Sequence, residues 1–143
     1  MIPGALLRLI RQFEGCRLRA YLCPAGVWTV GWGATGPGIT RGVVWDQPTA
    51  DARLGVDATK YLLAAIKQSP VLATDMDRAA AVADFCYNLG TGRYRASTLR
   101  RKINAEEWNS ACDELGKWVW GGGRKLPGLV RRRAAEATLL AED

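Results

Sequence analysis

The sequence predicts an α+β fold, with a small β-hairpin lobe and a mainly helical lobe enclosing a cleft. Three observations support this fold class. The chain opens with an amphipathic helical pattern, continues with a Gly-rich, β-prone stretch, and then shows helical patterns to its end. At 143 residues it is expected to form one domain over 1–143, with a β lobe over about 18–46 and a helical lobe over about 47–143.

The first helix and the hairpin follow from short-range patterns. Apolar residues at helical spacing predict a helix over 4–14: Leu6, Leu7, Leu9, Ile10 and Phe13. Two β-prone runs, 21–22 and 27–32, flank the turn sequence Pro24-Ala25-Gly26 and predict a hairpin. Residues 39–45 are a candidate third strand. Glycines concentrate in this region, which favours a small, bulged sheet on the surface.

Helices are predicted over most of the remaining chain. Pro48 suits the first turn of a helix whose apolar pattern covers 50–66. The stretch 76–89 is Ala-rich with few charges and is expected to be the central buried helix. Three more helices are expected, over 97–103, over 104–118, and from just after Pro127-Gly128 to Leu140.

The formal net charge is +6, from 20 Lys and Arg against 14 Asp and Glu. Net charge is informative about the partners of a protein and not about its fold. It suits an anionic polymer, either nucleic acid or a bacterial wall, although solubility alone would also account for it. Arg131, Arg132 and Arg133 are expected on a solvated helix face. The apolar runs are too short to span a membrane, and no motif of nucleic-acid-binding proteins occurs. We therefore expect neither stable membrane insertion nor nucleic-acid binding.

Histidine is absent, and the cysteines are widely scattered. The lack of histidine excludes Ser-His-Asp and Cys-His nucleophile systems, His-ligated metals and imidazole proton shuttles. Without a C-x-x-C pair, the four cysteines make a poor zinc signature: Cys16, Cys23, Cys86 and Cys112. Cys86 and Cys112 lie in apolar helical patterns and are expected to be buried free thiols. The even count would also allow two disulfides.

Glu14, Cys23 and Thr29 surround the predicted hairpin and form the candidate catalytic set. A Glu at a helix C-terminus opposes the helix dipole, so Glu14 is either an exposed terminal acid or a proton donor placed there for function. Cys23 is a small apolar plug, half of a disulfide (with Cys16, for instance) or a functional thiol. Thr29 could be an ordinary strand residue. The residues alone leave these alternatives open.

The segment E-G-C-R-L-R-A-Y-L-C-P-A-G-V-W-T-V-G-W-G-A-T-G resembles the active-site signature of phage-type lysozymes, glycoside hydrolase family 24. That family's triad is Glu, eight residues, Asp or Cys, five residues, Thr, and Glu14, Cys23 and Thr29 fit it without a gap. The resemblance continues through D-F-C-Y-N-L-G-T-G and L-P-G-L-V-R-R-R-A-A-E, so it covers nearly the whole chain. It implies a lysozyme-like fold and an endolysin, a muramidase with which phages degrade peptidoglycan to lyse the host cell.

The chemistry implied by the resemblance is hydrolysis of the β-1,4 bond between N-acetylmuramic acid and N-acetylglucosamine. Glu14 would be the general acid, and Cys23 with Thr29 would activate the attacking water, as in inverting glycosidases. Family members more often carry Asp where Cys23 stands, and only the thiolate of a cysteine is a good base or nucleophile. Nearby Arg17 or Arg19 would favour that thiolate. The alternatives are a covalent Cys23 nucleophile and an attenuated module that only binds peptidoglycan.

The resemblance also implies the substrate-binding residues. Thr35, Tyr87 and Asn88 match positions that line the family's saccharide cleft. Trp118 and Trp120 either wall the cleft or fill the core, with at least one expected in the core. The reaction implies no metal and no cofactor.

The implied partner is bacterial peptidoglycan, and the protein is expected to act as a monomer. The resemblance implies synthesis in the cytoplasm of the host bacterium and action in the periplasm, at the cell wall. The export route is not visible in this chain.

Overall fold

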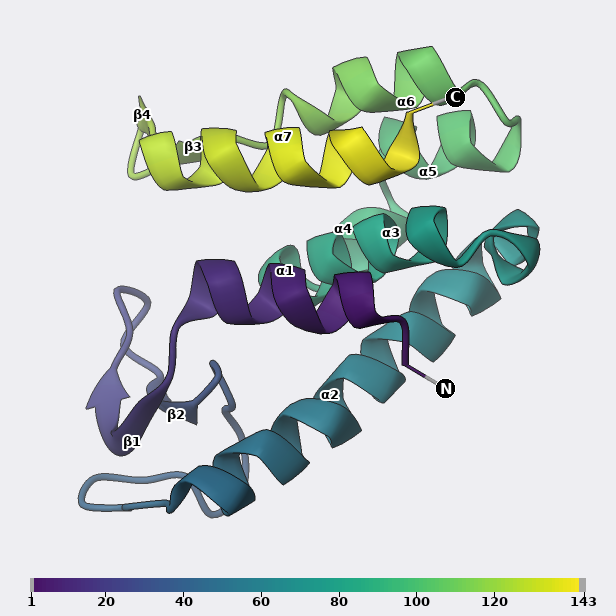
Figure 1. Ribbon diagram of the computed structural model, residues 1–143. Helices are drawn as coiled ribbons and strands as arrows, with labels where there is room; N and C mark the ends of the chain where they lie inside the picture. The colour runs from purple at the N-terminus through teal and green to yellow at the C-terminus, as the bar shows by residue number, and fades with distance from the viewer. Residues whose placement is uncertain (1, 142–143) are drawn as a thin grey trace.

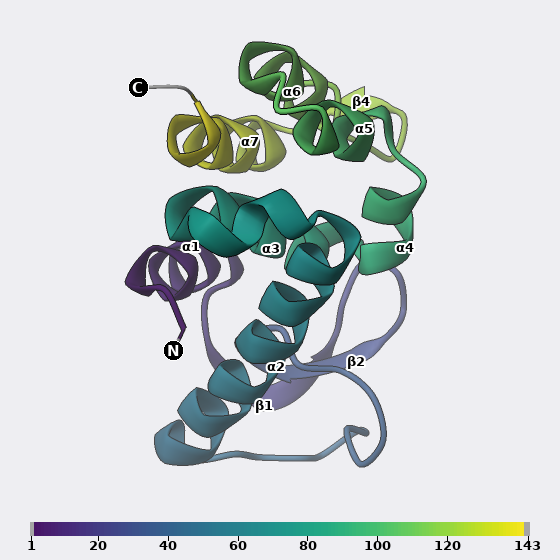
Figure 2. The same cartoon turned by 90° about the vertical axis from the view of Figure 1, so that its right-hand side faces the viewer.

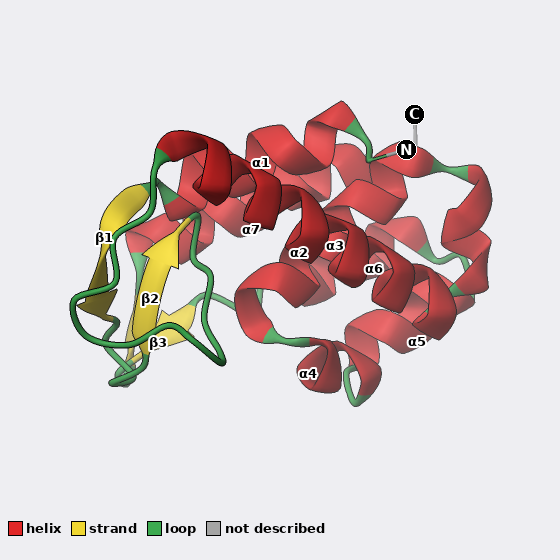
Figure 3. Ribbon diagram, turned by 90° about the horizontal axis from the view of Figure 1, so that it is seen from below, coloured by secondary structure: helices red, strands yellow, loops and turns green. Residues whose placement is uncertain are grey.

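The computed structural model describes residues 2–141 and confirms the predicted α+β fold. Helices make up most of the chain, and the strands gather at one end of the molecule (Figure 3). No helix described within residues 2–141 is both long enough and apolar enough to cross a membrane. In chain order the elements are α1 (Gly4–Glu14), β1 (Arg17–Leu22), β2 (Trp28–Gly31), α2 (Gln47–Gln68), η1 (Pro70–Thr74), α3 (Met76–Leu89), α4 (Thr91–Arg95), α5 (Thr98–Asn104), α6 (Trp108–Leu115), β3 (Trp120–Gly121), β4 (Arg124–Lys125) and α7 (Pro127–Leu140).

Helix α3 forms the centre of the helical lobe, as the sequence predicts. It packs against α1, α2 and α7 (Figures 1 and 2). All residues from 79 to 86 are buried, because a helix covered on every side must be apolar almost all round. Asp75 caps its N-terminus by accepting a hydrogen bond from the Arg78 N–H at 3.1 Å. The one charged residue in the buried run is Asp84, which belongs to the site described below.

The β lobe is a two-stranded antiparallel sheet with its own hydrophobic cluster. Across the β1–β2 ladder, Tyr21 faces Thr29 and Leu22 faces Trp28, and the register shifts between Arg17 and Tyr21. This irregularity agrees with the bulged sheet that the glycines predict. The cluster beneath the sheet consists of Ala20, Val30, Ala34 and Ile39.

The expected strand over 39–45 is wrong. A turn interrupts the segment, closed by a hydrogen bond from the Val43 N–H to the Thr40 carbonyl at 3.2 Å and containing Gly42 at a φ of 85°. Val44 joins β1 through an isolated bridge to Arg19. The segment is therefore a loop whose end, Val43 to Trp45, hydrogen-bonds to the edge of β1.

The expected continuous helix over 104–118 is also wrong. Asn104 closes α5, and α6 covers Trp108–Leu115. Between them Glu106 has a positive φ of 58°, which a continuous right-handed helix does not accommodate. The other predicted helices match α1, α2, α3, α5 and α7 closely.

The Gly run after α6 forms a second hairpin, β3–β4. Gly122 and Gly123 occupy its tip at φ values of 58° and 80°, a region that favours glycine. A Cβ on Gly121 would lie 2.5 Å from the Leu126 side chain, so glycine lets Leu126 lie against the strand. Gly121 of this hairpin lies beside the space between the two lobes.

Candidate active site

An open cleft of about 710 Å³ separates the β lobe from the helical lobe. Residues of β1, β2 and their turn form one wall, and residues of α2, the end of α3 and β3 form the other. The lining includes every site residue predicted from the sequence: Glu14, Cys23, Thr29, Thr35, Tyr87 and Asn88. Folding thus gathers all of these residues around one cleft.

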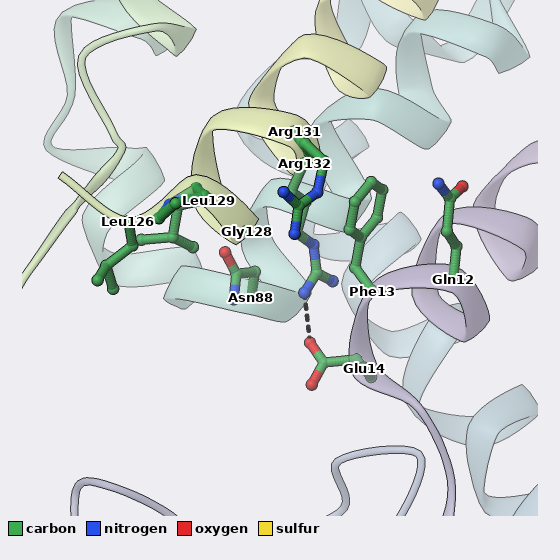
Figure 4. Close-up of a pocket in the computed structure, with 10 residues that line it drawn as sticks. Gln12, Phe13, Glu14, Asn88, Leu126, Gly128, Leu129, Arg131 and Arg132 are labelled. Atoms are coloured by element: carbon green, nitrogen blue, oxygen red, sulfur yellow. Dashed lines mark hydrogen bonds and ion pairs between the residues drawn. The ribbon is translucent and has the colours of Figure 1, made fainter.

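Glu14 lies where this cleft meets a second hollow of about 620 Å³. Phe13, Leu126 and Arg132 are among the residues that bound the second hollow (Figure 4). The Glu14 side chain is 22% exposed, so it is partly buried yet accessible. Arg132 donates from Nη1 to Glu14 Oε2 at 2.6 Å. This cation offsets the unfavourable placement of an acid at a helix C-terminus.

Arg132 is itself held by a buried carboxylate on α3. Its Nε and Nη2 donate to the two oxygens of Asp84, each at 2.8 Å. Burial alone would raise the pKa of Asp84, but hydrogen bonds from Arg132 and Glu136 leave that pKa below its usual value. A bidentate pair of this kind fixes the plane of the guanidinium. It therefore also fixes the nitrogen that faces Glu14.

The expectation of a solvated arginine face is wrong for two of its three residues. Arg131 is exposed, whereas Arg132 and Arg133 are buried. The reason is that α7 packs on α3, where Asp84 neutralises a guanidinium from a position 48 residues away in sequence. A run of arginines does not reveal such a distant partner.

Arg133 connects the buried charges to Asn88. Its Nη2 donates to Asn88 Oδ1 at 2.7 Å and to Glu136 Oε2 at 3.2 Å. The amide oxygen of Asn88 is thereby occupied. Its NH₂ group is left as the donor that it can offer to a ligand in the cleft.

Cys23 and Thr29 lie on either side of the hairpin turn and converge on Val27. The Cys23 N–H and the Thr29 hydroxyl both donate to the Val27 carbonyl, each at 3.0 Å. A hydrogen bond from the Val27 backbone, with smaller contributions from the Ala25 and Gly26 backbone, lowers the pKa of the Cys23 thiol. The turn therefore favours the thiolate form.

The expectation that Arg17 or Arg19 would favour this thiolate is wrong, since neither is among the groups that shift the pKa of Cys23. Arg17 instead lies 4.3 Å from the ring centroid of Tyr21 in a cation–π contact. All four cysteines are free thiols, and Cys86 is fully buried. Among residues 2–141, no three His, Cys, Asp or Glu side chains gather in a way that could hold a metal ion.

Tyr87 and Thr35 make contacts that cross between the lobes. The Tyr87 hydroxyl donates to the Trp32 carbonyl at 2.5 Å, and burial raises the pKa of Tyr87 above its usual value. The Thr35 carbonyl accepts from Arg53 Nη2 at 2.8 Å, while its side chain is exposed at the cleft. These contacts hold the hairpin lobe against α2 and α3.

Sequence reasoning missed the part of the cleft that α2 forms. Arg53, Asp57, Lys60 and Tyr61 line this wall, and Arg53 Nε lies 3.0 Å from Asp57 Oδ2. Their spacing of four and three positions puts them on one helix face. A polar stripe at this spacing within the predicted helix is the signal that could have found them.

The tryptophans near the Gly run take different positions. Trp118 packs edge-on against Phe85 at a centroid distance of 5.4 Å, so it belongs to the core. Trp120 is 63% exposed and precedes Gly121, which lines the cleft. This outcome agrees with the expectation that at least one of them fills the core.

Comparison with known proteins agrees with this arrangement. Residues 11–136 match the family described as phage lysozyme. The chain is 36% identical over 125 residues to a SAR-endolysin of Bacteriophage PS119, covering 86% of this chain and 73% of that protein. It is also 36% identical over 137 residues to an endolysin of Acyrthosiphon pisum secondary endosymbiont phage 1, covering 93% of this chain and 92% of that protein.

The fold is also found among solved structures. The muramidase domain of SpmX from Asticaccaulis excentricus superposes with a TM-score of 0.86 at 27% identity, covering 100% of this chain and 99% of that one. The family match spans most of the sequence, and both phage relatives exceed 30% identity over most of it. The chain therefore belongs to the phage lysozyme family and is a glycoside hydrolase of the lysozyme, or muramidase, type.

Proposed function

We propose that this protein cleaves the β-1,4 bond between N-acetylmuramic acid and N-acetylglucosamine, with Glu14, Cys23 and Thr29 as the catalytic residues. The observation that carries the proposal is their convergence: Glu14 from the end of α1 and the hairpin pair line one open cleft between the lobes. An open cleft suits a substrate that is one stretch of a long glycan strand. Thr35, Tyr87 and Asn88 are proposed to contact that strand.

Glu14 acts in this proposal as the general acid that protonates the leaving glycosidic oxygen. Arg132 occupies Oε2 at 2.6 Å, and Oε1 lies on the side of Gly33. Oε1 is thus the oxygen that can carry the transferable proton. Once the proton has left, the guanidinium stabilises the carboxylate that remains.

Cys23 acts with Thr29 on the opposite side of the sugar. The Cys23 thiolate takes a proton from a water molecule as that water attacks the anomeric carbon, which inverts its configuration. The lowered pKa of Cys23 supports the presence of the thiolate. A direct attack by sulfur would instead form a glycosyl–sulfur bond that water later breaks, with retention.

Purified peptidoglycan provides the test. Hydrolysis is expected to release new reducing ends, and NMR of the first product is expected to show inversion at the anomeric carbon. Retention would assign Cys23 the nucleophile's role. An attenuated binding module would pellet with peptidoglycan and release no reducing ends, which would overturn the proposal.

Substitution of Cys23 is expected to separate thiol chemistry from packing. Cys23→Ala is expected to lower the rate by about 10²-fold or more because no base remains. Cys23→Asp is expected to keep substantial activity because its carboxylate can accept the proton from water instead. Reducing-end release measures both rates. Cys16→Ala, a change of another partly exposed thiol at the end of α1, is the control and keeps the wild-type rate. Wild-type activity in Cys23→Ala would show that Cys23 takes no part in the reaction.

Gly33 is expected to be necessary for the position of Glu14. A Cβ on Gly33 would lie 2.9 Å from Glu14 Oε1, and the residue has a φ of 94°. Gly33→Ala should therefore cost about 1–2 kcal/mol of unfolding free energy and also displace the carboxylate. Gly36→Ala is the control, since its φ is 111° and its Cβ would have no neighbour within 4 Å. Denaturant unfolding should show similar losses of stability in Gly33→Ala and Gly36→Ala. The reducing-end assay should show a larger loss of activity in Gly33→Ala. Equal losses of activity in the two variants would contradict the prediction.

The proposed setting is the periplasm of a host bacterium, after synthesis in its cytoplasm, with the protein acting as a monomer on the cell wall. The net charge of +6 suits a wall rich in carboxylate and phosphate. Light scattering checks the monomer, and pelleting with purified walls at rising salt checks the contribution of charge.

A further inference from the structure

We propose that Asp84 and Glu136 share one proton and act as positioning residues for Glu14, because they keep Arg132 directed at it. The link to Glu14 rests on the proposed function. The shared proton rests on the buried cluster itself and does not depend on that function.

Charge balance in the cluster favours such a proton in the state in which Glu14 is ionised. Five charged side chains from α1, α3 and α7 meet there: Glu14, Asp84, Arg132, Arg133 and Glu136. If all were ionised, three carboxylates would face two guanidinium groups. The side chains of Asp84 and Glu136 are 0% exposed, and an uncompensated charge in such a place is unfavourable. One retained proton makes the cluster neutral.

Within residues 2–141, two further titratable groups face the cluster, Cys86 and Tyr87, and neither is charged near neutral pH. Burial raises the pKa of the Cys86 thiol, on α3, to about 12. Burial likewise raises the pKa of Tyr87, which lies between Glu14 and α2. Neither group supplies or removes a charge near neutral pH, so the count of two cations against three acids stands.

The hydrogen bonds indicate which carboxyl group holds the proton. Asp84 accepts two short bonds from Arg132, each at 2.8 Å. Glu136 accepts one longer bond of 3.2 Å, from an Arg133 nitrogen that also serves Asn88 at 2.7 Å. Glu136 Oε1 lies 2.9 Å from Arg133 Nε, yet neither atom makes a hydrogen bond of acceptable geometry. Glu136 is thus the carboxyl group with the weaker support for a negative charge.

A protonated Glu136 also satisfies its contact with Asp84. The two carboxyl groups lie within hydrogen-bond reach, where two anions would repel and an O–H donor would bind. Burial first, and then the contact with Asp84, raise the pKa of Glu136 well above its usual value. Asp84 remains the anion, holds Arg132 at two points, and leaves Nη1 for Glu14.

Carbon-13 NMR of the side-chain carboxyl groups tests the shared proton without any need for activity. Wild type is expected to show one Glu carboxyl resonance that stays at the protonated position at about pH 7, far above the usual titration range of Glu. This resonance disappears in E136Q. If every Glu carboxyl in wild type is ionised at that pH, the proposal is overturned, whatever the protein does to peptidoglycan.

Two substitutions of Glu136 give a second test. Glutamine has the shape of the protonated acid and can donate to Asp84, so E136Q is expected to keep the wild-type Tm within about 2 °C. Methionine has no donor and is expected to lower Tm by roughly 5–10 °C. An ionised Glu136 paired with Arg133 would make E136Q as destabilising as E136M, and that result would refute the shared proton.

The pH dependence of stability has a defined sign. Folded Glu136 keeps its proton after the unfolded chain has lost it, so this residue lowers wild-type stability as pH rises above about 4.3 towards its folded pKa. E136Q lacks this loss, and its Tm relative to wild type should increase between about pH 5 and pH 8. A difference that does not change with pH would count against the proposal.

The positioning role is tested at Asp84. D84N frees the charge of Arg132 to act on Glu14 alone, which favours the ionised form of Glu14. The alkaline limb of the kcat profile should move to lower pH by about 1 unit, with KM unchanged, while E136Q leaves that limb in place. A folded D84N with an unmoved limb would exclude the positioning role. If D84N does not fold, D84E replaces it, because its longer side chain displaces the carboxylate. An alkaline limb of the kcat profile that does not move between wild type and D84E would then exclude the positioning role equally.

Discussion

Replacing Glu14 with glutamine is expected to lower the rate of peptidoglycan hydrolysis by about 10²- to 10⁴-fold. Glutamine keeps the shape of the side chain and can still accept the hydrogen bond that Arg132 Nη1 makes at 2.6 Å. It has no proton to give to the leaving oxygen, so binding should survive while turnover is lost. Loss of turbidity from outer-membrane-stripped Gram-negative cells and release of reducing ends measure the rate.

The control is Glu107→Gln, which changes an exposed acid just before α6. Glu107 pairs with Lys102 at 3.4 Å and lies outside the cleft, so this variant should clear cells like wild type. Pelleting with peptidoglycan shows whether Glu14→Gln still binds. Equal clearing by Glu14→Gln and wild type would rule out Glu14 as the acid.

Removal of the Arg132 guanidinium has the second large effect. Arg132→Met leaves Asp84 as an unpaired carboxylate at a position with 0% exposure. Breaking a buried ion pair in this way costs roughly 3–5 kcal/mol of unfolding free energy, which lowers Tm by about 10 °C or more. Glu14 also loses its partner, so activity should fall even at temperatures where the variant is folded. Calorimetry and the reducing-end assay measure the two effects.

The neighbouring arginine supplies a matched control. Arg131 stands one position earlier on α7 and is exposed, so Arg131→Met should change Tm by less than about 2 °C. Adding Asp84→Leu to Arg132→Met removes the orphaned carboxylate and should recover part of the lost stability. Equal losses in the two single variants would show that the buried pair contributes nothing special.

Local sequence was sufficient for most elements of the fold. The apolar spacing over 4–14 and the Ala-rich run over 76–89 identified α1 and α3, because the packed face of a helix is recorded in its own sequence. The helix predicted over 104–118 failed at Glu106, where the backbone adopts a φ of 58°. Neither composition nor periodicity marks a non-glycine residue in that conformation.

The candidate site, too, could be predicted from local sequence only in part. Glu14, Cys23 and Thr29 lie within sixteen residues, and the hairpin between them is set by the turn at Pro24-Ala25-Gly26. Their proximity could therefore be inferred from spacing. The source of the lowered Cys23 pKa could not, because backbone groups of the turn, and not the nearby arginines, produce it.

The sequence by itself determined the α+β order of elements, the hairpin and the spacing of Glu14, Cys23 and Thr29 around it, since each depends on neighbours within a few turns of the chain. Tertiary structure alone decided that two of three consecutive arginines are buried and that Glu14 has a cation beside it. Those pairings join residues 48 and 118 positions apart. Their physical reason is the low polarity of the space between α1, α3 and α7, where a charge is stable only beside its opposite.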